Sequence, residues 1–349
     1  MKNEDLDSFL TKATVVFSYG EALKTLILTT AKASIELAQL LSNANLTGET
    51  AKLDNTNVQG EQQMQLDVVS NDIYIKAFKA SNVVAGFVSE ELADAVILNQ
   101  PLNQSSGQGN HQNKAENQFL ISFDPLDGSS NIAINGIVGS IFSILPVPKN
   151  SLLDNKAFLQ AGKNQLAALY VIYGPATMLV ISVGNGTHAF TLNNQLNNFQ
   201  LTHADMNIKA ETSEYAINAS NERYWETPIQ RYIAECKAGS AGVRGRDFNM
   251  RWMACMVTDV HRILMRGGVF LYPKDSKQPI KKGRLRLLYE ANPISMLVEQ
   301  AQGKSITGRT RIMDIQPTDI HERVPVILGS AEEVNLLAHY HQQYDESKG

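Results

Sequence analysis

A short apolar run ends in carboxylates and turn-forming residues at FLISFDPLDGSSN, residues 119–131. Residues 119–123 have the length and composition of a buried strand, and the residues after them are of the types that form turns and helix N-termini. The Gly-Ser-Ser segment at 128–130 can point consecutive backbone N–H groups outward at a helix start, where they could hold a phosphate group. The pattern therefore predicts that a strand delivers Asp124 and Asp127 to a point beside a phosphate cradle.

Two other predicted strands also end at carboxylates. Residues 82–88 are predicted to form a short strand followed by Glu90 and Glu91, and residues 285–289 a strand that delivers Glu290. Strand ends are where binding sites are usually assembled. We therefore expect the carboxylates of all three strands to meet at one point.

Five carboxylates at one point would repel one another and raise each other's pKa unless cations neutralised them. Hard oxygen ligands of this kind suit Mg²⁺ or Mn²⁺. A pair or cluster of such ions can clamp the attacking and leaving oxygens of a phosphate ester and lower the pKa of a bound water toward about 7. The pattern thus predicts metal-dependent cleavage of a phosphate ester.

Helices and strands are predicted in blocks along the chain and not in strict alternation. Apolar residues at helical spacing indicate one or two amphipathic helices over 13–41, and strand-like runs that fold back at 173–175 indicate antiparallel sheet over 166–192. No GxGxxG motif follows a first strand, and the order favours a layered α+β fold with mixed sheets over a simple Rossmann unit. Further helices are expected over 73–80 (after a cap within 65–72), 253–264 (ending at Gly267) and 293–302, and further strands over 141–145 and 269–272.

Length and charge limit the classes of protein to which the chain can belong. With 349 residues it exceeds the usual size of one hydrophobic core, so two packed lobes are expected. The formal net charge of -4 excludes a global basic field that would gather nucleic acid or anionic lipid. The chain starts with polar residues and its longest apolar runs are too short for a membrane span, so we expect neither a signal segment nor a membrane partner.

Several features are expected to have no catalytic role. Cys236 and Cys255 have no nearby His or second Cys pair, and we interpret them as buried thiols in a reducing cytoplasm and not as zinc ligands or a redox switch. His261 lies in a predicted helix and is interpreted as part of a structural or interface group and not as a general base. Residues 98–118 are mostly Asn, Gln, Ser and Gly, which predicts a mobile surface loop.

The motifs together make the chain resemble class I fructose-1,6-bisphosphatases, a family within the inositol monophosphatase-like, lithium-sensitive phosphatases. The superfamily shares only the Glu-Glu, Asp-x-x-Asp-Gly and late acidic points, which lie here within 88–91, 123–132 and 285–293. Three further stretches are similar to the bisphosphatase branch: NERY at 221–224, DVHR at 259–262 and GGVFLYP at 267–273. The likeness runs from roughly Leu66 to Ser330.

The resemblance implies hydrolysis of the 1-phosphate of D-fructose 1,6-bisphosphate to D-fructose 6-phosphate and phosphate, by water that divalent metals activate. It implies Mg²⁺, or alternatively Mn²⁺, with more than one ion per subunit, and a role in gluconeogenesis or another part of carbohydrate metabolism. The implied fold is an α/β/α/β/α sandwich, with a metal-binding lobe over 1–205 and a sugar-phosphate-binding lobe over 206–349. A cytoplasmic homotetramer that binds a small sugar bisphosphate is implied as well.

The resemblance also assigns roles to residues of this chain. Five positions are implied to ligate metal: Glu90, Asp124, the carbonyl of Leu126, Asp127 and Glu290. Three carboxylates are implied to position or deprotonate the attacking water: Glu91, Asp67 and Asp72. The implied substrate contacts are Asp127, Gly128, Ser129 and Ser130 for the 1-phosphate, and Asn221, Tyr224, Arg251, Tyr272 and Arg284 for the 6-phosphate. Arg251 is implied to reach in from a neighbouring subunit.

The chain departs from the animal pattern of the family at three positions. Trp252 stands where a phenol is expected, so it keeps an apolar wall but loses a hydroxyl. Arg284 stands where a lysine is expected, and it can bind phosphate bidentately where lysine acts as a point charge. Ala133 replaces an acidic residue after the cradle. The first two changes bear on the affinity for the 6-phosphate.

The sequence leaves alternative functions open. A sedoheptulose-1,7-bisphosphatase or an inositol-phosphate phosphatase would keep the metal site and differ in the pocket beyond it, where Asn221, Tyr224 and Arg251 argue for a second phosphate. A non-catalytic sugar-phosphate sensor on the same fold would be expected to have lost at least one metal carboxylate. All of those carboxylates are present here.

Overall fold

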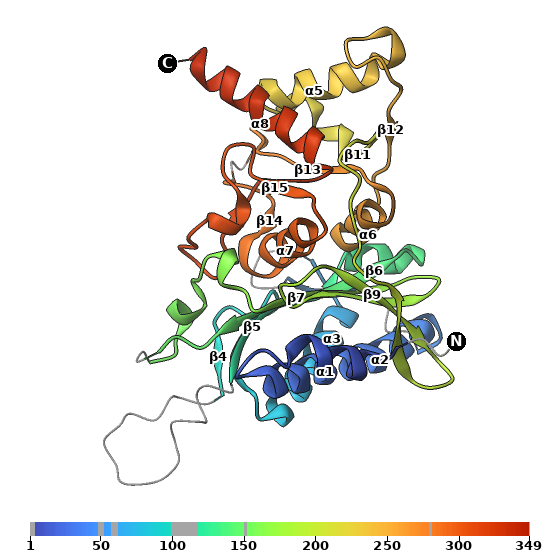
Figure 1. Cartoon of the computed structure of the whole chain (residues 1–349), viewed down its shortest axis with the longest axis vertical. Helices are drawn as coiled ribbons and strands as arrows, with labels where there is room; N and C mark the ends of the chain where they lie inside the picture. The colour runs from blue at the N-terminus through green and yellow to red at the C-terminus, as the bar shows by residue number, and fades with distance from the viewer. Residues whose placement is uncertain are drawn as a thin grey trace.

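A computed structural model of the chain describes residues 4–47, 52–56, 62–98, 118–149, 152–278 and 281–348. Five layers stack along its longest axis: N-terminal helices, an eight-stranded sheet, a middle layer of helices, a five-stranded sheet and two outer helices (Figure 1). This order confirms the α/β/α/β/α sandwich with mixed sheets. The surface loop expected over 98–118 falls, apart from its two end residues, outside the described residues.

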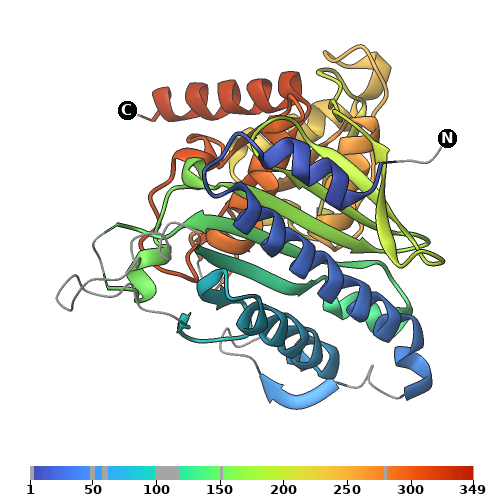
Figure 2. The same ribbon diagram turned by 60° about the horizontal axis from the view of Figure 1, so that its bottom comes forward.

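The first layer consists of α1 (Leu6–Thr14), α2 (Gly20–Thr47) and α3 (Gln65–Ser81), and Figure 2 shows α2 and α3 crossing one face of the sheet. Helix α2 confirms an amphipathic helix within 13–41, whereas α1 lies almost wholly before that range and was not predicted. The prediction that 65–72 only caps a helix over 73–80 was wrong, because 65–72 already forms the first turns of α3. The carboxylate of Asp67 accepts a hydrogen bond from the backbone N–H of Met64 at 2.7 Å, and this contact stabilises the earlier start.

The eight-stranded sheet has the order β10-β9-β8-β7-β6-β5-β3-β4. Strands β3 and β5 pair in parallel and β5 to β10 form an antiparallel series, so the sheet is mixed. The predicted fold-back at 173–175 is confirmed as the turn between β7 and β8. The strands are β3 (Val84–Ser89), β4 (Val96–Ile97), β5 (Phe119–Asp127), β6 (Val138–Pro146), β7 (Ala167–Tyr173), β8 (Thr177–Ser182), β9 (His188–Asn193) and β10 (Asn198–His203).

Strand β5 is longer than predicted. It continues past Phe123 to Asp127, and every residue in it is buried because helices cover both faces of the sheet. Opposite β6 it carries a bulge, in which residues 125–126 face the single residue Ser140. Asp124 and Asp127 therefore belong to the strand, on either side of the bulge, and not to a turn behind it.

The middle layer contains α6 (Met256–Arg266) and α7 (Asn292–Gln300). Helix α6 confirms the helix predicted to end before Gly267. The strand predicted over 285–289 was wrong in its second half, since β14 (Leu285–Arg286), paired with β16 (Arg323–Val324), gives way to a π-helical turn, η6 (Leu287–Ala291), that runs into α7. Glu290 thus lies in a helical turn and not at the end of a strand.

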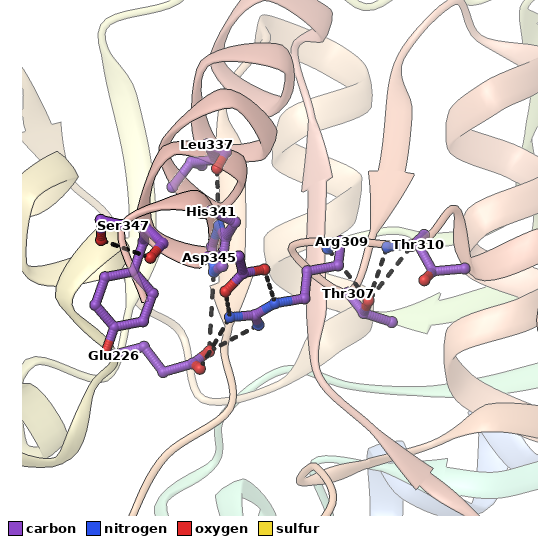
Figure 3. A network of polar contacts seen from close by, with 9 residues as sticks. Glu226, Thr307, Arg309, Thr310, Leu337, His341, Asp345 and Ser347 are labelled. Carbon is purple, nitrogen blue, oxygen red and sulfur yellow. Dashed lines mark hydrogen bonds and ion pairs between the residues drawn. The ribbon is translucent and has the colours of Figure 1, made fainter. Parts of the chain in front are cut away.

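The second sheet has the order β12-β11-β13-β17-β15. Its strands are β11 (Glu214–Ile217), β12 (Asn249–Met250), β13 (Val269–Tyr272), β15 (Lys304–Ile306) and β17 (Val326–Gly329), and α5 (Thr227–Lys237) and α8 (Ala331–Glu346) cover its outer face. The guanidinium of Arg309 bonds both to Asp345 near the end of α8 and to Glu226 just before α5, at 2.7–3.2 Å (Figure 3). This network ties the two outer helices together.

Smaller elements complete the described chain. Strands β1 (Lys52–Thr56) and β2 (Gln62–Met64) form a separate antiparallel pair, and 3-10 helices η1 (Ser129–Ile134) and η4 (Ala219–Tyr224) follow β5 and β11. Cys236 and Cys255 are buried and unpaired, as predicted. Among the described residues no helix combines the length and the apolar character needed to span a bilayer.

Candidate active site

Three carboxylates from two segments that are far apart in the sequence meet between the first sheet and the middle layer. Asp124 and Asp127 come from the end of β5, and Glu290 comes from η6. One oxygen of each side chain lies within 4.8 Å of an oxygen of the other two, and all three side chains are buried. Carboxylates from two of the three predicted segments thus meet in the structure. We call Asp124, Asp127 and Glu290 the acidic cluster.

Burial makes the negative charges of the acidic cluster costly. The pKa of Asp124 lies well above its ordinary value, chiefly because the carboxyl group is buried and further because Glu90, Asp127 and Glu290 are negatively charged nearby. The pKa of Asp127 is also raised by burial, although hydrogen bonds to its carboxylate oppose the shift. Repulsion and poor solvation therefore strongly favour the binding of protons or cations by these carboxylates.

The start of α6 holds Asp127 in place. Its Oδ2 accepts hydrogen bonds from the backbone N–H of Val257 at 2.7 Å and from the Cys255 thiol at 3.1 Å. Both donors use the same oxygen, so neither competes with a cation for Oδ1. The thiol contact was missed by the sequence analysis, which interpreted Cys255 only as a buried thiol. No local pattern indicates it, because the two residues are 128 positions apart in the sequence.

Arg286 connects Glu290 to the Glu90 segment. Its backbone N–H donates to Oε2 of Glu290, and its guanidinium, only 2% exposed, lies 3.5 Å from Oε1 of Glu90. Glu90 therefore lies at the margin of the acidic cluster, close enough to raise the pKa of Asp124. Arg286 was not among the predicted site residues, since an arginine inside an apolar run is usually read as a solvent-facing strand residue.

The predicted phosphate cradle lies beside α6. Gly128 has a φ of +76°, and a Cβ there would come within 2.7 Å of the Cβ of Cys255, so both the backbone conformation and the close packing require glycine. Ser129 and Ser130 follow as the first turn of η1. The N–H of Leu126, just before the cradle, donates to Asp124 Oδ1 at 2.9 Å and fixes the orientation of that carboxylate.

The three residues predicted to handle water are not members of the acidic cluster. Asp67 is buried and its Oδ2 accepts the N–H of Met64, whereas Asp72 is exposed on α3. The N–H of Glu91 donates to Ser89 Oγ at 3.2 Å. Ser89 in turn bonds to Asn71 of α3 at 2.7 Å, so the Glu-Glu segment is fastened to the helix that carries the two aspartates.

A pocket lies at the carboxyl ends of β11 and β13. We call it the second pocket, to distinguish it from the site at the acidic cluster. Two predicted phosphate ligands, Asn221 and Tyr272, line it together, and Tyr224 is anchored next to it by a hydrogen bond from the N–H of Ser276 to its carbonyl at 3.0 Å. Trp252 stacks on Phe270 and its ring centroid lies 5.7 Å from that of Tyr272. The pocket is lined by Ile217, Asn218, Asn221, Trp225, Leu271, Tyr272, Pro273 and Asp275.

The two predicted arginines differ in their surroundings. Arg284 forms a two-pronged pair with Asp275, a residue that lines the pocket, with Nε 2.9 Å from Oδ2. This pairing was not predicted, because nothing in the sequence near Asp275 indicates which cation it meets. Arg251 lies beyond the edge strand β12 and is exposed, with its backbone N–H bonded to the carbonyl of Tyr215 at 2.7 Å.

Comparison with known proteins identifies the family. The model for the fructose-1,6-bisphosphatase N-terminal domain matches residues 10–204, and the model for the fructose-1,6-bisphosphatase C-terminal domain matches residues 208–342. The chain belongs to the fructose-1,6-bisphosphatase family. The resemblance noted in the sequence is thereby confirmed.

Individual family members are similar over most of their length. The chain is 53% identical to the class 1 fructose-1,6-bisphosphatase of Acinetobacter baumannii, over 87% of this chain and 89% of that protein. It is 51% identical to the class 1 enzyme of Shewanella pealeana, over 91% and 92%. The crystal structure of Leishmania major fructose-1,6-bisphosphatase in holo form matches with a TM-score of 0.86 and 32% identity, covering 98% of this chain and all of that one.

Membership of the fructose-1,6-bisphosphatase family implies a divalent metal cofactor, and the acidic cluster fits one. Its three side chains offer hard oxygen ligands within 4.8 Å of one another, and their burial leaves negative charge that a cation would compensate.

His261 lies elsewhere in the middle layer, where its Nδ1 is 2.8 Å from the Tyr170 hydroxyl and burial lowers its pKa to about 4. That surrounding supports its interpretation as a structural residue.

Neutralising one carboxylate tests whether repulsion within the metal-free acidic cluster destabilises the folded protein. In EDTA we expect Asp124→Asn to raise the free energy of unfolding by about 1 kcal/mol, a usual gain when a strained functional site is relieved. With Mn²⁺ the variant should gain less stability from the metal than the unaltered chain, because it has lost a ligand. Urea denaturation with and without EDTA measures both quantities. Identical unfolding curves for the two chains in both buffers would contradict the prediction.

Proposed function

We propose that the chain hydrolyses the 1-phosphate of D-fructose 1,6-bisphosphate and releases D-fructose 6-phosphate and phosphate. The observation that carries the proposal is the buried acidic cluster directly beside a glycine-dependent phosphate cradle. Relatives that are about half identical to this chain are named class 1 fructose-1,6-bisphosphatases, so the sister activities on sedoheptulose or inositol phosphates are not favoured.

In this proposal the metal ions bind to Glu90, Asp124, the Leu126 carbonyl, Asp127 and Glu290. Divalent cations at such a site lower the pKa of a coordinated water and neutralise charge on phosphate oxygens. The backbone N–H groups of 128–130 bind the 1-phosphate and orient it toward the cluster. Glu91, together with Asp67 and Asp72 of α3, is assigned to orient the attacking water and to accept its proton. The bond from Ser89 to Asn71 supports this role, because it holds the Glu-Glu segment against α3.

The 6-phosphate binds in the pocket at the ends of β11 and β13. Asn221 and Tyr272 line it and supply neutral donors, and Tyr224 lies beside it. Arg284 donates from Nε and Nη2 to Asp275, so Nη1 is the nitrogen that we assign to the phosphate. Arg251 is assigned to the pocket of a neighbouring subunit, which its exposure beside an edge strand supports.

The wider biological setting is part of the same proposal. We infer Mg²⁺ as the working metal, with Mn²⁺ as a substitute, from the all-oxygen ligand set. A metal-binding lobe over 1–205 and a sugar-phosphate lobe over 206–349 are supported by the two family models, which meet between residues 204 and 208. Two unpaired thiols favour a cytoplasmic location. A homotetramer with a role in gluconeogenesis completes the proposal.

Phosphate release under defined metal conditions tests the reaction. We expect turnover of fructose 1,6-bisphosphate with Mg²⁺ or Mn²⁺, none in EDTA, and a loss of more than about 100-fold in kcat/KM for Asp127→Ala, since even substitutions behind a metal ligand cost 10- to 100-fold. Sedoheptulose 1,7-bisphosphate and inositol 1-phosphate serve as competing substrates. Faster turnover of either ester would identify that ester, and not fructose 1,6-bisphosphate, as the preferred substrate. Absence of turnover with all three esters would overturn the proposal.

A monophosphate substrate isolates the second pocket. We expect Tyr272→Phe and Arg284→Met each to raise KM for fructose 1,6-bisphosphate by about 10-fold, the scale of a lost hydrogen bond to a charged group, and to leave kcat nearly unchanged. With fructose 1-phosphate, which has no second phosphate, the same variants should behave like the unaltered chain. If KM for both substrates rose equally, the pocket would not be the 6-phosphate site.

A further inference from the structure

Four buried hydroxyl groups from four different elements meet inside the N-terminal half of the molecule. Tyr74 of α3 lies at the centre, with its Oη 3.0 Å from Ser34 Oγ of α2, 3.1 Å from Ser140 Oγ of β6 and 2.9 Å from Tyr173 Oη of β7. Ser140 and Tyr173 are also 3.1 Å apart. None of the four side chains is more than 8% exposed. We call this group the hydroxyl cluster.

The hydroxyl cluster ends at the peptide that joins the metal ligands. Ser140 Oγ donates to the carbonyl oxygen of Pro125 at 2.8 Å, and Pro125 lies between Asp124 and Asp127. Here β5 bulges, and Ser140 is the one residue of β6 that faces the two bulged residues. A bulge interrupts the ladder of backbone hydrogen bonds, and proline has no N–H to contribute to it. The Ser140 side chain therefore supplies a hydrogen bond to the bulge, where the regular ladder is interrupted.

Counting protons gives the hydroxyl cluster a direction. Each hydroxyl has one proton, and those of Ser140 and Ser34 are used on the carbonyls of Pro125 and Thr30, at 2.8 and 2.9 Å. Only the protons of the two tyrosines remain for the contacts within the cluster. Tyr74 donates to Ser140 and Ser140 to the Pro125 carbonyl, while Tyr173 has both Tyr74 and Ser140 within reach of its proton. Hydrogen bonds in such a chain polarise and strengthen one another.

Packing alone does not account for the hydroxyl of Tyr74. Its ring lies among Phe78, Phe123 and Phe142, with centroid distances of 4.8–6.1 Å, and a phenylalanine could make the same ring contacts. What the hydroxyl adds is a donor for Ser140. We propose that the hydroxyl cluster positions the segment that carries Asp124 and Asp127, and that Ser140 is the positioning residue through which it acts. The inference rests on the proposed function to the extent that these aspartates bind a divalent cation.

Mn²⁺ binding to the full chain without substrate tests the proposal separately from catalysis. The variants are Ser140→Ala, Ser140→Thr and Tyr74→Phe, and Ser143→Ala is the matched control. Ser143 is also buried on β6, and its Oγ, like that of Ser140, donates one hydrogen bond, here to Gln165 Oε1 at 2.8 Å. It pairs with Ser122 of β5 and not with the bulge. Free Mn²⁺ is measured by electron paramagnetic resonance, and thermal unfolding is recorded for each variant.

We expect Ser140→Ala to weaken Mn²⁺ binding by about 10-fold, the effect typical of a lost partner behind a metal ligand. Tyr74→Phe should act in the same direction, Ser140→Thr should restore binding because it keeps a hydroxyl, and Ser143→Ala should lower only the thermal stability. If Ser140→Ala does not fold, the Mn²⁺ affinity of Tyr74→Phe is compared with that of Ser143→Ala instead. Equal Mn²⁺ affinities in the test and control variants would overturn the inference and leave the metal site intact. Absence of Mn²⁺ binding by the unaltered chain would overturn the metal site and the inference with it.

Discussion

Three negative charges buried within a few ångströms of one another are the constraint on which the rest of this structure depends. Such a group is unfavourable as bare carboxylates, and it persists only if the surrounding fold holds each oxygen in place. Each member is fastened differently. Asp127 is held by donors at the start of α6, Asp124 by the N–H of Leu126, and Glu290 by the backbone N–H of Arg286. The packing of the sheets and helices around the cluster offsets the unfavourable energy of burying these carboxylates together.

The layered architecture gives the proposed function one region for each end of the sugar bisphosphate. The first sheet and the middle helices meet at the acidic cluster, and the second sheet directs the carboxyl ends of β11 and β13 to the second pocket. Helix α6 belongs to both regions, since the segment before it carries Trp252 and its first turn holds Asp127. Movement of this helix would therefore affect Asp127 of the acidic cluster and the packing of Trp252 against Tyr272, which lines the second pocket.

Local backbone requirements and the meeting of the carboxylates of β5 with Glu290 were predictable from the sequence, and the other long-range partners were not. The cradle and the carboxylates on β5 follow from short motifs whose backbone demands are local, such as the positive φ of Gly128. Glu290 was correctly expected to meet the carboxylates of β5, but it was assigned to the wrong element, because a short apolar run such as 285–289 suits a strand or a buried helical turn equally. The thiol contact of Cys255 and the pairing of Arg284 with Asp275 arise only from tertiary packing.

In the proposed function the buried carboxylates of the acidic cluster form a cation site. Anomalous X-ray scattering from crystals grown with Mn²⁺ and phosphate tests it most directly, because the metal signal is located independently of any assumption about the ligands. We expect an anomalous peak between Asp124, Asp127 and Glu290, with phosphate density at residues 128–130. Ordered carboxylates with no anomalous peak between them at saturating Mn²⁺ would contradict it.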